Sequence, residues 1–371
     1  MRVLVTGGAG FIGSHVVDDL LRQGHQVRVF DKLVEQVHGD RGPQFVSPEA
    51  ELHIGDMTDR DAVAKALVGV EQVVHLAAEV GVGQSMYEIS RYVDANTSGT
   101  GVLLDVLVNN KLEVSKIVVA SSMSIYGEGL YSCAEHGAVA PRLRTESQLR
   151  ERRWEPECPR CQRVLSPLPT TEDKPLFPSS VYAISKMDQE LLCLSVGAAY
   201  GIGVTAVRYF NAYGPRQALS NPYTGVAAIF SSRLLNGNPP LVMEDGNQKR
   251  DFIHVSDVAR ATVLALTAPK AEGQAINIGV GDPITITEVA TVLATTLGVD
   301  IEPEITGDYR AGDIRHCWAD PTLANELLGF TPEYRFRERG VKELVAWVAT
   351  QTAVDRVGDA REELINRGLT I

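Results

Sequence analysis

The chain lacks three features that would assign it at once to a broad class of protein. No apolar run reaches eighteen residues, the length at which a helix can cross a membrane. Positive charge is not in excess, since the formal net charge is -12 at pH 7, and an acidic surface disfavours nucleic acid as a partner. Only five of the 371 residues are cysteine, too few for a disulfide scaffold. We therefore expect neither a membrane span nor nucleic-acid binding.

The sequence begins close to its first predicted strand. MRVLVTGGAG runs directly into an apolar strand and a glycine turn, so we expect no signal peptide and a cytoplasmic protein. Apolar residues make up 44% and charged residues 22%, as in ordinary globular proteins. The length is sufficient for two lobes.

The first half of the chain alternates short apolar strands with amphipathic helices. Such alternation produces parallel βαβ units, so it predicts an α/β fold with a doubly wound parallel sheet. From about residue 212 the pattern is looser and turns rich in glycine and proline are frequent, which indicates a smaller second lobe. The polar end, residues 352–371, is predicted to be a surface helix. The predicted strands span residues 2–7, 26–31, 51–56, 72–78, 116–122 and 204–211, and the predicted helices 15–24, 61–69 and about 92–110.

A glycine triplet joins the first strand to the first helix. Gly7, Gly10 and Gly13 allow a tight turn in which backbone N–H groups approach a pyrophosphate at the helix N-terminus. A plain strand-to-helix turn would explain the triplet equally well, but Asp31 ends the next strand, where a carboxylate can accept from an adenosine ribose hydroxyl. The same carboxylate would repel a 2′-phosphate, so NAD is favoured over NADP. Asp56 ends the third strand and is either an adenine contact or a solvent-exposed strand end.

Three further residues could form an oxidoreductase site. Tyr182 and Lys186 are four residues apart and share one face of a predicted helix. The ammonium group, helped by a nicotinamide cation, could lower the phenol pKa and make Tyr182 a base. Ser122 stands at the carboxyl end of a predicted parallel strand, where ligands meet such sheets. A tyrosine–lysine pair alone is common on helix surfaces; its combination with the glycine turn and Ser122 is specific.

At this point the chain resembles the extended short-chain dehydrogenase/reductases, which include nucleotide-sugar epimerases and 4,6-dehydratases. The resemblance covers nearly the whole chain apart from one insertion and the polar end. It implies a Rossmann-type NAD domain, a C-terminal lobe that holds a nucleotide-diphosphate sugar, and a homodimer built through helices of the NAD domain. The motifs that carry it are TGGAGFIG at 6–13, HLAA at 75–78, NTSGT at 96–100, SSMSIYG at 121–127, YAISK at 182–186, RYFNAYGPRQ at 208–217 and RDFIHVSDV at 250–258.

The resemblance implies a domain division and a set of site residues. The NAD domain is expected at residues 1–208, interrupted by an insertion at 128–170, and the substrate lobe at 209–371, with part of 250–270 packing back on the NAD domain. Matched by position, the catalytic residues are Ser122, Tyr182 and Lys186. The residues expected at the cofactor are Gly7, Gly10, Phe11, Ile12, Gly13, Asp31, Asp56, Met57, Leu76, Ala77, Ala78 and Asn96, together with Tyr182 and Lys186. The residues expected at the substrate are Gln84, Ser122, Asn211, Arg216, Arg250 and Arg315.

The residues after Ser122 bear on the choice of reaction. The 4,6-dehydratases carry an acid and a base there as an Asp-Glu pair, whereas this chain has Met123 and Ser124, neither of which exchanges protons at neutral pH as a carboxyl does. A 4-epimerase that oxidises C4 of the sugar and returns the hydride to the opposite face, an isomerase, is therefore expected. A 4,6-dehydratase, a 4-keto reductase or an NAD-sensing binding protein are the alternatives.

The insertion contains a cysteine and histidine pattern. Cys133 and His136 form a Cys-x-x-His, and Cys158 and Cys161 a Cys-x-x-Cys. Four such ligands suit a structural Zn²⁺ ion, although short patterns of this kind also arise by chance. The segment from YGEGLYSCAEHG to PTTEDKPLFPSSVYAISK resembles the dTDP-L-rhamnose 4-epimerase branch, which implies dTDP-L-rhamnose or a related dTDP- or UDP-sugar as substrate.

Overall fold

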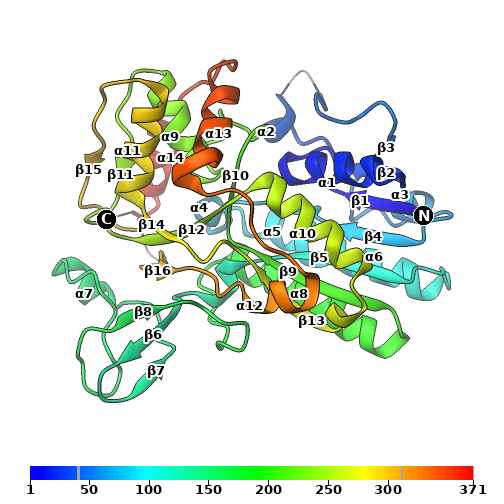
Figure 1. The fold of residues 1–371 in the computed structure, drawn as a ribbon, viewed down its shortest axis with the longest axis horizontal. Coiled ribbons are helices and arrows are strands. Elements are labelled where there is room, and N and C mark those ends of the chain that lie inside the picture. Colours follow the sequence, from blue (N-terminus) through cyan, green and yellow to red (C-terminus); the bar gives the residue numbers. More distant parts are fainter. Residues whose placement is uncertain (40–41, 311, 371) are drawn as a thin grey trace.

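A parallel sheet of seven strands forms the centre of the protein. The computed structural model describes residues 1–39, 42–310 and 312–370 (Figure 1). The strand order is β13-β9-β5-β4-β1-β2-β3, so the direction of winding reverses between β1 and β4, the place where a doubly wound sheet opens a ligand crevice. The predicted α/β doubly wound fold is confirmed. The strands are β1 (Arg2–Thr6), β2 (Gln26–Asp31), β3 (Glu51–Ile54), β4 (Gln72–His75), β5 (Lys116–Ser122), β9 (Gly203–Tyr209) and β13 (Gln274–Ile278).

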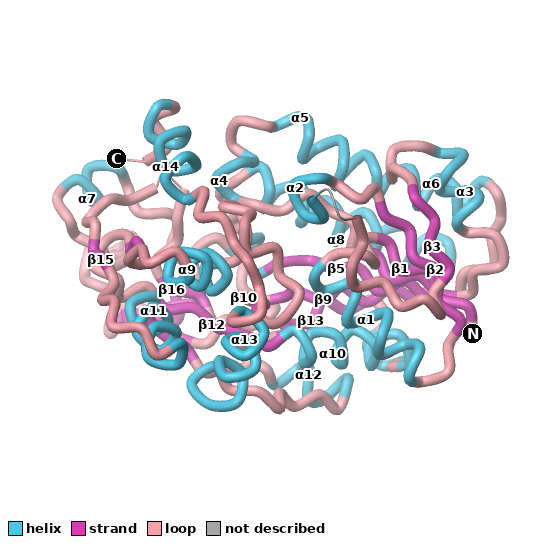
Figure 2. The backbone as a smooth tube through the Cα atoms, turned by 90° about the horizontal axis from the view of Figure 1, so that it is seen from above, coloured by secondary structure: helices cyan, strands magenta, loops and turns pink. Residues whose placement is uncertain are grey.

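Helices cover both faces of this sheet (Figure 2). One face packs against α1 (Phe11–Arg22), α10 (Val255–Thr267) and α12 (Thr322–Leu328). The other packs against α3 (Arg60–Ala66), α6 (Gly99–Asn109) and α8 (Val181–Tyr200). Residues of β4 and β5 are all buried, which is why these strands read as continuous apolar runs rather than alternating ones.

The helix expected at about 92–110 is divided into three parts. It begins at α5 (Ile89–Tyr92), continues through a π-helical turn, η2 (Val93–Ser98), and ends as α6. A π-turn inside a helix displaces one residue from the regular ladder, and Asn96 lies in this turn. The interruption has no signature in the apolar periodicity on which the prediction was based.

A smaller lobe follows the sheet. It is built on β10 (Asn211–Tyr213), β12 (Lys249–His254), β14 (Pro283–Thr285) and β16 (His316–Cys317), with β11 (Leu241–Val242) pairing β15 (Glu304–Ile305). The helices α9 (Val226–Leu235), α11 (Ile286–Leu297) and α13 (Val341–Val348) enclose its core. The chain returns to the large sheet at α10, within the expected 250–270 segment, and again beyond it as the edge strand β13.

The insertion has regular structure where the sequence suggested only a loop. Its antiparallel sheet consists of β7 (Gly137–Val139), β6 (Leu130–Cys133) and β8 (Ser166–Leu168), and α7 (Glu146–Arg150) follows β7. Figure 1 shows it projecting from the body of the molecule below β16. Strands of three or four residues are too short to display a period-two pattern.

The remaining elements are short, apart from the helix near the C-terminus. No described helix has the length and apolar character needed to span a membrane. The elements are α2 (Glu35–His38), α4 (Val82–Ser85), η3 (Met123–Tyr126), η4 (Pro269–Ala271), η5 (Phe336–Gly340) and α14 (Val357–Asn366).

Candidate active site

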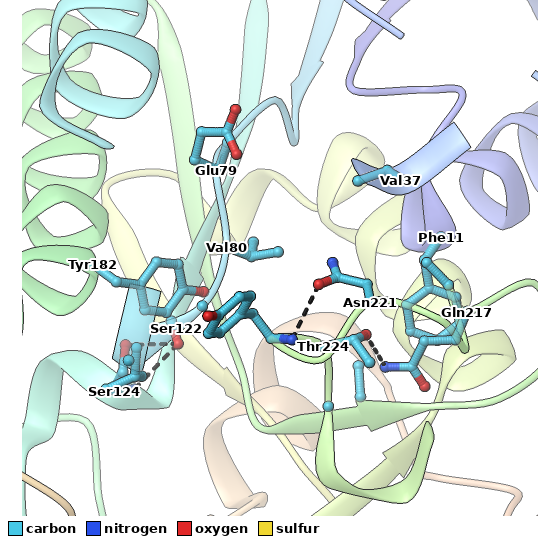
Figure 3. A pocket seen from close by; sticks show the side chains of 18 of the residues that line it. Phe11, Val37, Glu79, Val80, Ser122, Ser124, Tyr182, Gln217, Asn221 and Thr224 are labelled. Atoms are coloured by element: carbon cyan, nitrogen blue, oxygen red, sulfur yellow. Dashed lines mark hydrogen bonds between the residues drawn. The ribbon is translucent and has the colours of Figure 1, made fainter. Parts of the chain in front are cut away.

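A cavity of about 1330 Å³ lies between the carboxyl ends of the large sheet and the smaller lobe. Its walls come from the glycine turn, the ends of β2, β4 and β5, the start of α8, strands β10 and β12, and α14. Figure 3 shows Ser122 and Tyr182 on one side of the cavity and Phe11 and Gln217 on the other. The dimensions suit a dinucleotide and a second ligand side by side.

The glycine turn forms one end of the cavity. Gly7 has φ +69, and a Cβ there would meet Ala77 N at 2.8 Å, while a Cβ on Gly13 would lie 2.1 Å from Gly7 O. Only glycine fits at these two positions. Helix α1 begins at Phe11, and Gly10 before it offers no side-chain cap, so the first N–H groups of a helix that starts in the cavity wall have no capping side chain.

Two acidic residues mark the adjacent wall. Asp31 Oδ2 accepts from Ala9 N at 3.0 Å and Oδ1 from Leu33 N at 2.9 Å, so the carboxylate is fixed in place at the end of β2. Asp56 pairs with Lys32 at 2.6 Å. Lys32 also lines the cavity and was not singled out from the sequence, because a lysine after a strand carries no distinguishing pattern.

All but one of the residues expected at the cofactor line this cavity. The exception is Asn96, which is fully buried beside it. Its side-chain amide donates to Ser185 Oγ at 2.9 Å and to Glu79 O at 3.0 Å, and its Oδ1 accepts from Glu79 N at 2.7 Å. Asn96 thus fixes the loop after β4. Those that do line it are Gly7, Gly10, Phe11, Ile12, Gly13, Asp31, Asp56, Met57, Leu76, Ala77, Ala78, Tyr182 and Lys186.

Ser122 and Tyr182 face each other across the cavity wall. Ser122 ends β5, and Tyr182 is in the first turn of α8, whose start is capped by Ser180 Oγ accepting from Ala183 N. The Ser122 hydroxyl lies close enough to the Tyr182 phenol to influence its pKa. Ser124 Oγ donates to Ser122 Oγ at 2.9 Å, as drawn in Figure 3. The sequence motif therefore brings its two hydroxyl groups together.

The pKa of Tyr182 is raised in the nucleotide-free protein, whereas the sequence led us to expect that Lys186 and a nicotinamide cation would lower it. Burial raises the pKa of Tyr182, and the neighbouring Ser122 hydroxyl opposes that rise. Burial lowers the pKa of Lys186 to about 7, and Lys186 Nζ donates to Gln189 Oε1 at 2.5 Å. The protein alone therefore does not favour a tyrosinate. Gln189, one helical turn after Lys186, is buried and also donates to Ala77 O at 3.3 Å. Sequence analysis missed this residue, and its spacing three residues after Lys186 on α8 is the feature that could have identified it.

Two of the residues expected at the substrate line the cavity beside Ser122. Arg250 donates to the carbonyl oxygens of Lys249, Ile314 and Arg315 at 2.7–3.0 Å, so the recorded partners of its guanidinium are neutral. Asn211 Oδ1 is buried without a hydrogen-bond partner among the described residues. A positive charge and an orphaned acceptor in one wall would suit a polar, anionic ligand.

Gln84 and Arg216 lie elsewhere, and their expected contact with substrate is not supported. Gln84 does not line the cavity, and its amide donates to Gln36 and Glu88. Arg216 has φ +71 and pairs with Asp18 of α1 at 2.8 Å. Its guanidinium therefore joins the lobe to the large sheet.

Arg315 was also expected at the substrate, but its side chain is 1% exposed and lies outside the cavity wall. It pairs with Asp245 at 2.6 Å, Glu155 at 2.7 Å and Glu244 at 2.9 Å. Arg144 of the insertion pairs with the same Glu244 at 2.9 Å. We call Glu128, Arg144, Glu155, Glu244, Asp245 and Arg315 the buried charge network. The guanidinium of Arg315 is already paired with three carboxylates, and nothing in the sequence indicated that these residues would lie beside it.

The structure adds cavity residues that the sequence reasoning missed. Arg310 is 36% exposed, pairs with Asp313 at 3.1 Å and lines the same cavity as Arg250. The loop after β10 contributes Gln217, Asn221 and Thr224, with Gln217 Nε2 donating to Thr224 Oγ1 at 3.3 Å (Figure 3). This loop was noted only for its glycine and proline content, which does not distinguish a binding loop from a plain turn.

The cysteine and histidine residues of the insertion form one cluster. The ligand atoms of Cys133, His136, Cys158 and Cys161 all lie within 4.8 Å of one another. Cys133 Sγ is 3.6 Å from Cys161 Sγ and 3.4 Å from His136 Nδ1, and Cys158 Sγ is 3.5 Å from His136 Nδ1. A tetrahedral zinc ion separates two sulfurs by roughly 3.8 Å and a sulfur and a nitrogen by roughly 3.6 Å. The donor set and spacing fit such an ion.

Comparisons with known proteins agree with this geometry. The chain is 36% identical over 353 residues to dTDP-L-rhamnose 4-epimerase of Burkholderia thailandensis, covering 94% of this chain and 95% of that one. The structure of UDP-glucose 4-epimerase with UDP-glucose from Thermotoga maritima superposes with a TM-score of 0.77 at 31% identity, covering 94% of this chain and 99% of that one. The NAD complex of Thermus thermophilus UDP-glucose 4-epimerase gives 0.74 at 30% identity, with 95% and 100% covered.

A family profile matches most of the chain. It covers residues 3–147 and 159–279 and is described as that of the NAD dependent epimerase/dehydratase family. The unmatched residues, 148–158, lie inside the insertion, and Cys158 is the last of them. On this match and the 36% identity to a curated relative, the chain belongs to the NAD dependent epimerase/dehydratase family.

Proposed function

We propose that the protein is an NAD-dependent nucleotide-sugar 4-epimerase. The observation that carries the proposal is that Ser122 and Tyr182 line the same cavity as the glycine turn and Arg250. One end of that cavity suits a dinucleotide and the other a diphosphate-linked sugar. The relatives named above are epimerases of this kind.

NAD, when bound, supplies a hydride acceptor and a positive charge beside the phenol. Tyr182 removes the proton of the sugar C4 hydroxyl and later returns a proton to the same oxygen. Ser122 donates to the C4 oxygen as it becomes a carbonyl, and Lys186, held by Gln189, stabilises the phenolate and orients the cofactor ribose. Arg250 holds the diphosphate while the 4-keto sugar turns over to present its other face. No external oxidant is consumed.

A 4,6-dehydratase is the competing function within the family. Elimination of water needs an acid and a base beside the sugar, and the relevant positions hold Met123 and Ser124. Met123 packs with Tyr126 and Phe210 in an apolar cluster, and Ser124 donates to Ser122. Neither supports proton transfer at C5 or C6.

A panel of nucleotide sugars tests the proposal. Incubation with UDP-, dTDP- and GDP-sugars, followed by NMR of the products, is expected to yield 4-epimers and no 4-keto-6-deoxy sugar. The insertion and the relative of 36% identity favour dTDP-L-rhamnose as the substrate within this panel. Formation of 4-keto-6-deoxy sugars would instead assign the chain as a dehydratase.

We further propose that the cluster in the insertion binds one structural zinc ion. Four protein ligands leave no open position, so the ion would hold β6 and the Cys158–Cys161 turn together rather than react. Elemental analysis of purified protein is expected to give about one zinc per chain. Protein that is folded and active with zinc well below that ratio would remove this proposal.

The quaternary state and the domain division also belong to the proposal. Apolar side chains on α5, η2 and α8 are exposed: Ile89 by 53%, Val93 by 39%, Ile184 by 45% and Leu191 by 49%. Because these elements pack side by side, the four side chains supply an apolar face for a second copy of the chain. Residues 1–208 would then form the NAD-binding and dimerising part, with 209–371 as the substrate lobe.

A further inference from the structure

The last described residues of the chain pass across the substrate end of the cavity. Residues 354–370, called the C-terminal tail below, contain a stretch without regular structure, α14, and a short end. Figure 2 shows α14 beside the described C-terminal end of the chain, at the edge of the smaller lobe. The tail residues that line the cavity are Val357, Ala360, Arg361, Leu364 and Thr370.

The root of the tail is firmly attached to the smaller lobe. Asp355 accepts from Asn238 Nδ2 at 2.8 Å and pairs with Arg233 at 3.2 Å, both side chains of the ion pair being nearly buried. Val354 N donates to Ser220 Oγ at 3.0 Å, and Asn236 Nδ2 to Ala353 O at 3.0 Å. These contacts fix residues 353–355 independently of α14.

The outer part of the tail reaches the NAD-domain side through few contacts. Leu364 packs against Gly83 of α4, where a Cβ would stand 3.4 Å from its methyl groups. The guanidinium of Arg367 lies 4.3 Å from the centre of the Tyr87 ring, and its side chain is 46% exposed. The tail therefore bridges two walls of the cavity, strongly at its root and weakly at its outer end.

The tail also brings positive charge to the cavity. Arg361 pairs with Asp308, and Thr370 forms an antiparallel backbone bridge with Arg310. Together with Arg250, the cavity wall thus holds guanidinium groups from β12, from the segment after β15 and from α14. Guanidinium groups bind diphosphates in a bidentate manner.

We propose that the C-terminal tail closes the cavity over a bound nucleoside diphosphate sugar, with Arg361 and Leu364 as affinity-determining residues. The substrate class rests on the function proposed above. The segment after the firmly held root allows α14 to swing away for entry once four outer contacts break: those of Leu364 with Gly83 and of Arg367 with Tyr87, the Arg361–Asp308 ion pair and the Thr370–Arg310 bridge. Closure keeps water out and retains the 4-keto sugar between its two proton transfers.

Binding of UDP and dTDP to the NAD-loaded protein tests the proposal directly. By calorimetry, Arg361→Ala is expected to weaken the binding of these nucleotides about tenfold, the loss of one charge-assisted contact. A chain ending after Ala353 should bind at least as weakly. Glu362→Ala is the matched control, since Glu362 is the exposed neighbour on the same helix, and should leave binding unchanged. Bound NAD, read by absorbance, should be equal in all four proteins.

Hydrogen exchange on the intact chain provides a readout that needs no variant. Adding dTDP is expected to slow backbone exchange in residues 357–366, and Leu364→Ala should raise exchange there in the free protein. Unchanged exchange in α14 together with wild-type affinity in Arg361→Ala would overturn the proposal. If dTDP protects α14 while the sugar panel gives no epimer, the tail proposal stands and the proposed reaction fails. If epimers form but dTDP does not protect α14, the proposed reaction stands and the tail proposal fails.

Discussion

At the scale of single residues, burial controls the charge of the side chains around the proposed reaction site. Ser122, Tyr182 and Lys186 belong to short motifs whose spacing on a strand end and a helix fixes their position. The hydrogen bond from Lys186 to Gln189 and the raised pKa of Tyr182 depend on burial. Arg216 and Arg315 were assigned to the substrate by the family resemblance, and their ion-pair partners, Asp18 and Glu155, lie too far away in sequence to have been foreseen.

Changing Tyr182 to Phe should reduce epimerisation by about a hundredfold or more, because the proton at the C4 oxygen would have no acceptor. NAD should remain bound, since the ring is retained. Tyr200→Phe is the control: Tyr200 ends the same helix and is 62% exposed. NMR of the sugar products and absorbance of bound NAD measure both effects. An active Tyr182→Phe protein contradicts the assignment.

The buried ammonium of Lys186 predicts how stability depends on pH. Its folded pKa of about 7 is below the ordinary lysine value of 10.5, so the unfolded chain binds more protons between these values and stability rises with pH there. Lys186→Met should therefore stabilise the nucleotide-free protein most at pH 6 to 7. The gain should shrink by about 1.4 kcal/mol per pH unit above pH 7.

Thermal unfolding of both proteins between pH 6 and 9.5 measures this gain. A difference in melting temperature that stays constant over the range would mean that Lys186 keeps its proton throughout.

At the scale of elements, the insertion combines a predicted cluster with an unpredicted network. The Cys133–His136 and Cys158–Cys161 spacings suggested one metal site, and the structure brings the four side chains together. Arg144 of the insertion pairs with Glu244, which follows β11 and lines the cavity, and Glu155 pairs with Arg315, which precedes β16. These ion pairs join the insertion to the smaller lobe. No local pattern reveals such pairs, because each joins segments remote in sequence.

Replacing Cys158 and Cys161 by Ser should release the zinc and lower the melting temperature, because ligand binding to the folded state is part of its stability. Arg160→Ala, at an exposed position between the two cysteines, should do neither. Elemental analysis and calorimetric melting give the two readouts. Equal melting temperatures for the double variant and the wild type would show that the ion contributes nothing to folding.

Arg315→Met should destabilise the protein by about 3 kcal/mol, since the buried Glu244 would keep only Arg144 as a partner and the partly exposed Glu155 and Asp245 would lose the same guanidinium. Arg337→Met is the comparison, because Arg337 forms an exposed pair with Glu288 and such pairs contribute about 1 kcal/mol or less. Urea unfolding followed by circular dichroism measures both. Similar losses for the two variants would contradict a stabilising role for the buried charge network.

At the scale of the whole molecule, the alternation of strands and helices was enough to predict the doubly wound sheet. It did not predict that β13 would complete the sheet from residues 274–278, since that strand follows a lobe with its own core. At this point the neighbours in the sheet are not neighbours in the sequence, because β13 pairs with β9 although β10, β11 and β12 lie between them along the chain. The lobe is thereby connected to the sheet by several crossings rather than by one linker.

Leu191→Glu combined with Ile89→Glu should convert a dimer into monomers, because charges on the apolar face of α5 and α8 oppose its burial. Val68→Glu, at an apolar side chain 63% exposed outside that face, should leave the assembly unchanged. Light scattering coupled to gel filtration measures the mass. A wild-type protein of monomer mass would remove the proposed interface.

The two ends of the insertion meet in an antiparallel pair, Leu130 opposite Leu168. In engineering terms this makes residues 131–167 an exchangeable cassette, because a short turn could join the two strands without moving Ser122 or Tyr182. The exchange would have one constraint. Arg144 leaves with the cassette, so a replacement must bring its own counterion for the buried Glu128, or Glu128 must be made neutral together with it, whereas Glu244 keeps Arg315.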